Sequence, residues 1–122
     1  MKKKQKTISQ LKREADRVFG IWIRKRDNHR CYTCGYQKQP EETQCGHYMS
    51  RSHTNTRYNE KNCHCQCVAC NIFKYGNMQI YAIRLQNQYG QGILKELFRK
   101  AHMIKKADRK FYEGIIKKYL IN

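Results

Sequence analysis

Two Cys-x2-Cys pairs constrain the fold of this chain more than any other feature of its sequence. Cys31 and Cys34 form the first pair, Cys67 and Cys70 form the second, and 32 residues lie between them. Each short pair can supply two corners of a tetrahedron, so four thiolates can close around one zinc ion. Because a closed site leaves no open position for water, the predicted zinc is structural.

The other three cysteines, Cys45, Cys63 and Cys65, fall between the two pairs. Cys63 or Cys65 is an alternative zinc ligand because both lie close to Cys67, but neither forms a Cys-x2-Cys pair with it. We expect all three to be small buried residues rather than catalytic thiols. The odd cysteine count, the metal-like spacing and an N-terminal stretch without the apolar segment of a signal peptide predict a reducing cytoplasm.

The charge of the chain points to an anionic partner. There are 26 lysines and arginines against 9 aspartates and glutamates, which gives a net charge of +17. Such an excess repels itself in a compact chain, and binding to a polyanion relieves the repulsion. We expect the partner to be DNA; for RNA only the charge and the aromatic content argue. A membrane is not expected, because no apolar run approaches the roughly 18 residues that span a bilayer.

The 122 residues predict a single domain of the α+β class, mostly α. Residues 1–30 are expected to form a basic N-terminal helix, residues 31–76 a zinc-stabilised core, and residues 77–122 a helical region. The first helix is predicted over Thr7 to Lys25, because apolar residues recur at helical spacing from Ile8 to Ile23 and Thr7-x-x-Gln10 has capping-box form.

The core is predicted to be a treble-clef zinc finger. A strand over Thr43–Met49, a basic loop, a return strand over Asn62–Cys65 and two helical turns over Val68–Tyr75 follow the first cysteine pair, and Gly76 ends the unit. This is the order of a ββα-metal fold.

Three more helices are predicted in the last third. Asn77 caps one that ends at Gly90, Ile93–Ala101 marks the next, and Asp108 caps the third. This region either supplies a dimer interface or packs back on the N-terminal helix.

Polar residues of the predicted finger suggest catalysis. His47 ends one strand, Asn62 begins its partner, and Asn71 follows the last zinc cysteine, so the three are expected to converge on one face. This order of residues is the HNH pattern.

Longer motifs carry a resemblance to a known family. The motifs are Phe19-x2-Trp22-Ile23-Arg24-x-Arg26-Asp27, Cys31-x2-Cys34-Gly35, Gly46-His47-Tyr48, Asn62-x-His64-x-Gln66-Cys67-x2-Cys70-Asn71 and Lys74-x-Gly76-Asn77. Between Phe19 and Gly90 the chain resembles the NinG (Rap) family of phage recombination proteins. The resemblance implies an HNH (His-Me finger) endonuclease, acting on Holliday junctions or D-loops in the cytoplasm of the bacterial host. A homodimer is the oligomeric state expected of such an enzyme.

The resemblance also implies roles for the residues. His47 would accept a proton from the attacking water, Mg²⁺ or Mn²⁺ would be held partly by Asn71, and Asn62 would orient the histidine loop. Many HNH enzymes have a metal-binding aspartate directly before the histidine, where this chain has Gly46. His64 is the preferred second ligand of the catalytic metal, and Asp27 is another candidate.

A binding role without catalysis is the alternative. The same chain would then be a zinc-containing protein that recognises structured DNA. In both readings the expected DNA contacts are the basic residues Lys12, Arg13, Arg17, Arg24, Arg51, Arg57 and Lys74. Catalysis requires His47 and Asn71 to converge, whereas binding does not.

Overall fold

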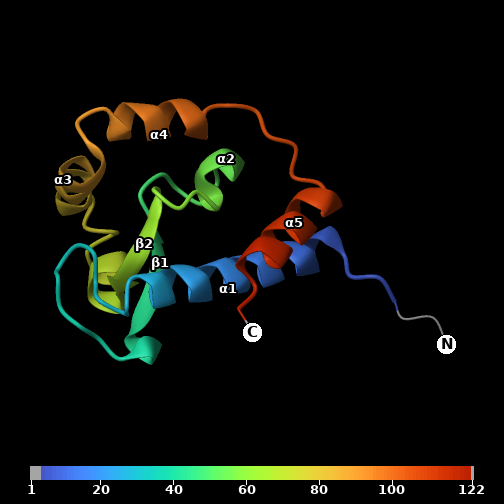
Figure 1. The fold of residues 1–122 in the computed structure, drawn as a ribbon, viewed down its shortest axis with the longest axis horizontal. Helices are drawn as coiled ribbons and strands as arrows, with labels where there is room; N and C mark the ends of the chain where they lie inside the picture. Colours follow the sequence, from blue (N-terminus) through green and yellow to red (C-terminus); the bar gives the residue numbers. More distant parts are fainter. Residues whose placement is uncertain (1–3, 122) are drawn as a thin grey trace.

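The computed structural model describes residues 4–121, so residues 1–3 of the lysine-rich start and residue 122 are outside it. The fold is mostly helical α+β with one small sheet, as predicted (Figure 1). In chain order the elements are α1 (Ile8–Arg26), η1 (Pro40–Glu42), β1 (Thr43–His47), α2 (Thr54–Arg57), β2 (Cys63–Cys67), η2 (Ala69–Phe73), α3 (Met78–Tyr89), α4 (Ile93–Ala101) and α5 (Arg109–Tyr119). Among the described helices, none combines the length and apolarity needed to cross a membrane.

Helix α1 contributes the most residues to the main apolar core, and its predicted N-terminal cap is present. The Thr7 hydroxyl accepts from the Gln10 amide, and the Gln10 side chain accepts from the Thr7 amide. The apolar stripe from Leu11 to Ile23 is buried against the sheet and α5. The capping box fixes where this stripe begins and therefore which side chains face inward.

Helix α5 packs back on α1, which is one of the two arrangements expected of the C-terminal region (Figure 1). Asp108 caps the helix by accepting from the Phe111 amide at 2.9 Å. Tyr119 then packs edge-on against Phe19, with ring centroids 4.8 Å apart. The N-terminal helix α1 and the C-terminal helix α5 thus share one apolar cluster.

Helices α3 and α4 form a second apolar cluster around Tyr81, Leu85, Ile93 and Leu97. The predicted cap of α3 is only partly right. Asn77 is the residue before the helix, but its backbone is left-handed (φ 51°) and its side chain makes no capping bond. Its amide instead lies 3.8 Å from the sulfur of Cys70.

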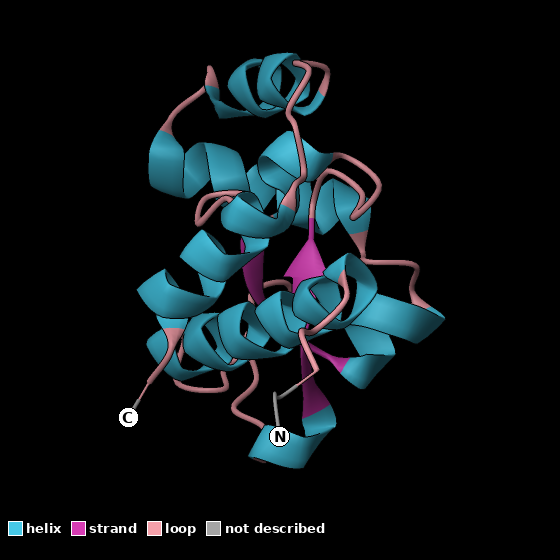
Figure 2. Cartoon of the chain, turned by 90° about the vertical axis from the view of Figure 1, so that its right-hand side faces the viewer, coloured by secondary structure: helices cyan, strands magenta, loops and turns pink. Residues whose placement is uncertain are grey.

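The sheet has two antiparallel strands and is enclosed by helices (Figure 2). His47 pairs with Cys63 and Gly46 pairs with His64, so the strands occupy Thr43–His47 and Cys63–Cys67. The predicted first strand ran two residues too far, and the return strand begins and ends later than predicted. Because side chains alternate along a strand, His47 and His64 point to opposite faces of the sheet.

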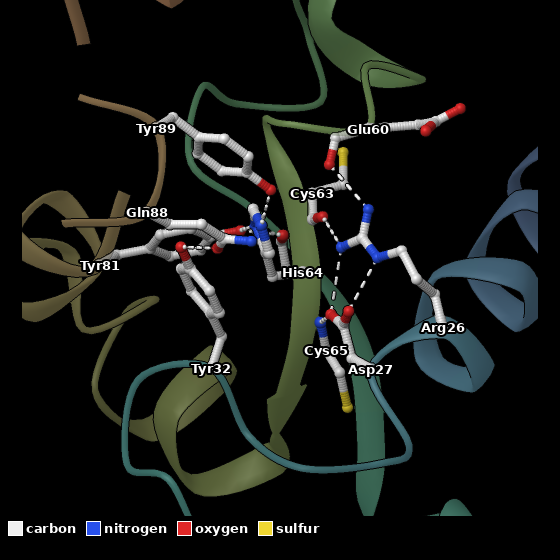
Figure 3. Close-up of polar contacts among 11 residues, drawn as sticks. Arg26, Asp27, Tyr32, Glu60, Cys63, His64, Cys65, Tyr81, Gln88 and Tyr89 are labelled. Carbon is white, nitrogen blue, oxygen red and sulfur yellow. Dashed lines mark hydrogen bonds and ion pairs between the residues drawn. The ribbon is translucent and has the colours of Figure 1, made fainter. Parts of the chain in front are cut away.

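The outer edge of β2 is covered by two side chains from the end of α1 (Figure 3). Asp27 accepts from the Cys65 amide at 2.8 Å, and Arg26 donates to the Cys63 carbonyl at 2.9 Å. The Tyr32 amide donates to the Cys65 carbonyl at 2.8 Å. These contacts satisfy backbone groups that an edge strand otherwise leaves unpaired.

The element after the second cysteine pair differs from the prediction. Two α-helical turns were expected over Val68–Tyr75, whereas the structure has a five-residue π-helix at Ala69–Phe73 followed by a turn. The turn ends at Gly76, which has φ 87°, and the Gly76 amide bonds the Cys70 carbonyl at 2.9 Å. The wider π-turn places Asn71 beside β1.

Candidate metal centre and basic cavity

The four cysteines of the two pairs form one cluster, as predicted. Their sulfur atoms all lie within 4.8 Å of one another, and the sulfurs of Cys34 and Cys67 are 3.8 Å apart. A tetrahedral site with zinc–sulfur bonds near 2.3 Å places its sulfurs roughly 3.8 Å apart. The cluster can therefore hold zinc with little movement, and neither Cys63 nor Cys65 takes part.

Backbone amides support the charge that zinc ligands must carry. The Cys34 amide donates to the Cys31 sulfur and the Cys70 amide donates to the Cys67 sulfur, each at 3.5 Å. Burial opposes ionisation of Cys31, but hydrogen bonds from Cys34 and Thr33 outweigh it and lower the pKa of that thiol to about 6. Gly35, with φ 80°, provides the turn that closes this knuckle.

A cavity of about 720 Å³ lies between α1, β1 and η2. Its lining includes His47, Asn71 and four charged residues, which are Asp16, Arg17, Arg24 and Arg51. Three of these four are arginines, so the cavity suits an anion. His47 and Asn71 thus line one cavity, although they come from different elements.

His47 has a defined tautomer. Its Nε2 lies 2.9 Å from the Arg57 carbonyl, and because a carbonyl can only accept, Nε2 carries the proton. Nδ1 is left with the lone pair. Burial, helped by Arg51 and Arg57 and opposed by the Arg57 carbonyl, lowers the pKa of His47 to about 4. The ring is therefore neutral at pH 7 and can accept a proton.

Asn62 holds the loop between the strands. Its amide donates to the carbonyls of Met49 at 3.1 Å and Thr56 at 3.0 Å, and its oxygen accepts from the Met49 amide at 2.7 Å. The side chain is fully buried. Because this loop carries the Arg57 carbonyl, Asn62 acts on His47 through the backbone.

Asp16 is a central residue of the site that sequence reasoning missed. Its carboxylate accepts from Arg57 at 2.6 and 2.9 Å, from Arg51 at 2.9 Å and from the Tyr58 hydroxyl at 2.7 Å. Burial raises its pKa, but the bonds from Arg57 and Tyr58 prevail and lower it. The only signal in the sequence is that Asp16, like Glu14, is an acidic residue within the basic stretch from Lys12 to Arg17.

Arg57 does not fit the DNA contact predicted for it. Only 8% of the residue is exposed. Its guanidinium binds Asp16 and donates to the Arg51 carbonyl at 2.6 Å. It therefore ties the loop to α1 instead of facing solvent.

The remaining predicted DNA contacts are more accessible. Lys12, Arg13, Arg17 and Lys74 are exposed, and so is Arg51 despite its contact with Asp16. Arg24 is half-buried and donates to the Gly20 carbonyl at 3.2 Å.

His64 lies on the face of the sheet opposite to His47. Figure 3 shows it among Tyr32, Tyr81 and Tyr89. It is 1% exposed and stacks on Tyr32, with ring centroids 3.8 Å apart. Its Nδ1 lies 3.1 Å from the Tyr81 hydroxyl and its Nε2 lies 3.0 Å from the Tyr89 hydroxyl. Burial lowers its pKa to about 3, so the ring is neutral. This placement argues against the predicted role of His64 as a ligand beside Asn71.

The cavity does not by itself make a magnesium site. Asn71 donates its amide to the Gln44 oxygen at 2.7 Å, which leaves the Asn71 oxygen available. Within residues 4–121 the only acidic side chain lining the cavity is Asp16, and its oxygens are bonded to arginines and Tyr58. Asp27, the other candidate ligand, covers the edge of β2. Mg²⁺ is usually held through one or two carboxylates, which this cavity does not offer.

Comparisons with known proteins agree on one family. The family model described as "Bacteriophage Lambda NinG protein" matches residues 1–122. Proteins named "Protein ninG" from Escherichia phage 933W and Escherichia phage lambda are each 33% identical over 87 residues, which is 70% of this chain and 43% and 42% of theirs. The protein of that name from Salmonella phage P22 is 31% identical over 87 residues, covering 70% of this chain and 42% of its own. The chain thus spans about two fifths of the length of these relatives. No solved structure matches it significantly.

Proposed function

Because the chain belongs to the NinG family of bacteriophage proteins, we propose that it is an HNH-type (His-Me finger) endonuclease of phage DNA recombination. Its substrate is branched DNA, such as a Holliday junction or a D-loop, in the cytoplasm of the infected bacterium. The observation that supports this best is the neutral imidazole of His47 in a cavity shared with Asn71 and three arginines.

The chemistry follows from the tautomer of His47. Nε2 is held by the Arg57 carbonyl, so Nδ1 is the nitrogen that can take a proton. A water attacks the phosphorus and its proton passes to Nδ1. The bond from phosphorus to the 3′ oxygen breaks, and that oxygen leaves with the electron pair and takes a proton from solvent. The low pKa keeps His47 unprotonated before the reaction, but it also makes the imidazole a weak base. Negative charge from a bound phosphate would strengthen it.

The arginines supply the positive charge. Arg17, Arg24 and Arg51 line the cavity, and their positive charges can stabilise the negative charge that develops on the phosphate oxygens. Asn71 adds a polar contact and is the residue that would hold a Mg²⁺ or Mn²⁺ ion in part. Since the cavity offers that ion no available carboxylate, the proposed chemistry rests on His47 and the arginines. The zinc of the four cysteines is structural.

A zinc-containing protein that binds structured DNA without cleaving it is the second candidate. The bonded state of the Asp16 carboxylate and the weak basicity of His47 favour it. Such a protein would recruit a nuclease to the same branched DNA.

Cleavage of labelled DNA tests the proposal. Purified protein is incubated with a four-way junction, a D-loop and a linear duplex, in Mg²⁺, in Mn²⁺ and in EDTA. We expect cleavage of the branched substrates that is lost in His47→Ala and reduced in Asn71→Ala. His53→Ala, a change at a histidine of the segment between β1 and β2, is the matched control and retains activity. Junction binding without cleavage by the wild-type protein under every condition would favour the second candidate.

We also propose that the active form is a homodimer, because a four-way junction presents two equivalent strands for cleavage. Analytical ultracentrifugation with and without a junction measures the stoichiometry. One protein chain per junction at saturation would contradict this.

A further inference from the structure

A second group of metal-ligating side chains lies on the face of the sheet that packs against α1. We propose that Cys45, His47 and Cys63 form a soft-metal site, distinct from the four-cysteine cluster, that takes Zn²⁺ from the cavity. An ion on Nδ1 of His47 would occupy its lone pair, and an ion on Nε2 would move the ring proton to Nδ1. Either way His47 could no longer accept a proton.

Strand register brings the three residues together. His47 and Cys63 are direct partners, and Cys45 precedes His47 by two residues, so all three project from the same face. The candidate ligand atoms of the three lie within 4.8 Å of one another. Bond lengths near 2.3 Å to sulfur and 2.0 Å to nitrogen require separations of roughly 3.5–3.8 Å. A small contraction therefore completes three corners of a tetrahedron.

The site is open on one side only. Cys45 and His47 line the 720 Å³ cavity, whereas Cys63 is fully buried behind them. An ion entering through the cavity meets two ligands at once, and its fourth position faces the cavity. Three protein ligands with one open position are typical of sites that exchange ligands, in contrast to a closed site of four cysteines.

Without metal, two of the three ligand side chains hydrogen-bond to the backbone. The Arg57 carbonyl lies 2.9 Å from His47 Nε2 and 3.5 Å from the Cys63 sulfur, so both groups can donate to one oxygen. His47 is already neutral, the form that a metal requires. Zn²⁺ would displace one proton from each of Cys45 and Cys63, which leaves the filled site without net charge. Because both thiols must lose a proton, binding is expected to strengthen with rising pH.

The metal site is argued independently of the proposed nuclease activity. Only the predicted inhibition by zinc rests on that proposed function. If His47 is the proton acceptor, an ion on its ring blocks the reaction. Cleavage with added zinc should then fall by roughly 10²-fold or more, the usual contribution of a general base.

Metal content is the first test, since it needs no activity. Reduced protein is equilibrated with a zinc buffer, and zinc per chain is counted. We expect two ions in the wild-type protein, one in Cys45→Ser, and two in Cys65→Ser, a buried cysteine on the same face that belongs to neither cluster. Cobalt substitution should add a thiolate charge-transfer band that Cys45→Ser reduces. One ion in the wild-type protein, or two in Cys45→Ser, would overturn the site.

Cleavage is the second test. Each protein is assayed with Mg²⁺, with and without added zinc. The effect of zinc is the ratio of the two rates for the same protein. Zinc should inhibit the wild-type protein and Cys65→Ser but leave Cys45→Ser little affected. Equal inhibition of all three would overturn the link to His47. If the wild-type protein cleaves nothing, the nuclease proposal fails while the metal count still decides the site.

Discussion

Asp16 joins the helix to the loop that holds His47. Four hydrogen bonds converge on its carboxylate, two of them from the buried guanidinium of Arg57. Removing one partner of a buried ion pair leaves an uncompensated charge, which costs about 3 kcal/mol. Asp16→Asn should lower the free energy of unfolding by about that amount in urea denaturation.

The matched control for Asp16 is its near neighbour Glu14. Glu14 also forms an ion pair, with Lys6, but the Lys6 side chain is 59% exposed whereas the Arg57 side chain is 10% exposed. Exposed pairs contribute little, so Glu14→Gln should change the unfolding free energy by less than about 1 kcal/mol. Equal effects of the two changes would show that Arg57 does not depend on Asp16.

His64 links stability to pH. Burial lowers its pKa from 6.5 to about 3, so the unfolded chain binds a proton to this histidine before the folded chain does. The contribution of neutral His64 to the free energy of unfolding is full above pH 6.5 and declines as the pH falls toward 3. The wild-type protein should lose up to a few kcal/mol over this range, and His64→Gln should lose less.

Urea denaturation at each pH measures this difference. Tyr89→Phe is the control, because it removes the partner of Nε2 and leaves the imidazole in place. The unfolding free energy of Tyr89→Phe should depend on pH with the same slope as that of the wild-type protein. Parallel pH curves for His64→Gln and the wild-type protein would contradict the assignment.

At the scale of elements, packing between the two strands explains why position 46 is a glycine. A Cβ at this position would lie 1.9 Å from the Gln66 side-chain oxygen. Gln66 itself bridges the two cysteine knuckles, donating to Thr33 at 3.1 Å and to the Gly76 carbonyl at 2.8 Å. The space for an aspartate before His47 is therefore filled by Gln66.

This packing predicts a rescue. Gly46→Ala should lower the free energy of unfolding by about 3 kcal/mol, at the upper end for overpacking. In the background of Gln66→Ala the same change should cost less than about 1 kcal/mol, because the clashing side chain is gone. Urea denaturation of the four proteins of this cycle measures the coupling, and an unchanged cost would exclude the clash as the cause.

The four longer α-helices could be predicted closely from sequence because their signals are local, whereas the short helices η1 and α2 lie in segments predicted to be loops. The capping box at Thr7, the cap at Asp108 and the stop at Gly90 all act within a few residues of the helix end. The π-helix at Ala69–Phe73 could not be predicted in this way, since its width depends on packing of the cysteine pair. Strand ends were wrong by one or two residues for a similar reason.

The candidate site was predictable in part. The four cysteines of the metal cluster follow from spacing alone, and the strand that carries His47 follows from the short run around it, although the end of that strand does not. The register of the hairpin decides that His64 faces away, and spacing does not reveal register. The contact of Asp16 with Arg57 joins residues 41 positions apart, and no local pattern specifies it.

At the scale of the whole molecule, the charge of +17 should govern DNA binding. Each phosphate neutralised contributes about −0.9 to the slope of log affinity against log salt. Arg17→Gln should reduce the magnitude of that slope by about 0.9 if this exposed cavity residue contacts a phosphate. Lys117→Gln, an exposed change on α5 outside the cavity lining, is the control and should leave it unchanged. Fluorescence anisotropy over a salt series measures both, and an affinity independent of salt would exclude nucleic acid as the partner.

The cover that Arg26 and Asp27 place over β2 also bears on how the protein avoids self-assembly. A bare strand edge is a template on which a strand of a second molecule can add, and repeated addition yields fibrils. Here the amide and carbonyl of Cys65 and the carbonyl of Cys63 are already bonded within the chain. The end of α1 thus leaves fewer free backbone groups on the outer edge of β2 with which a second molecule could pair.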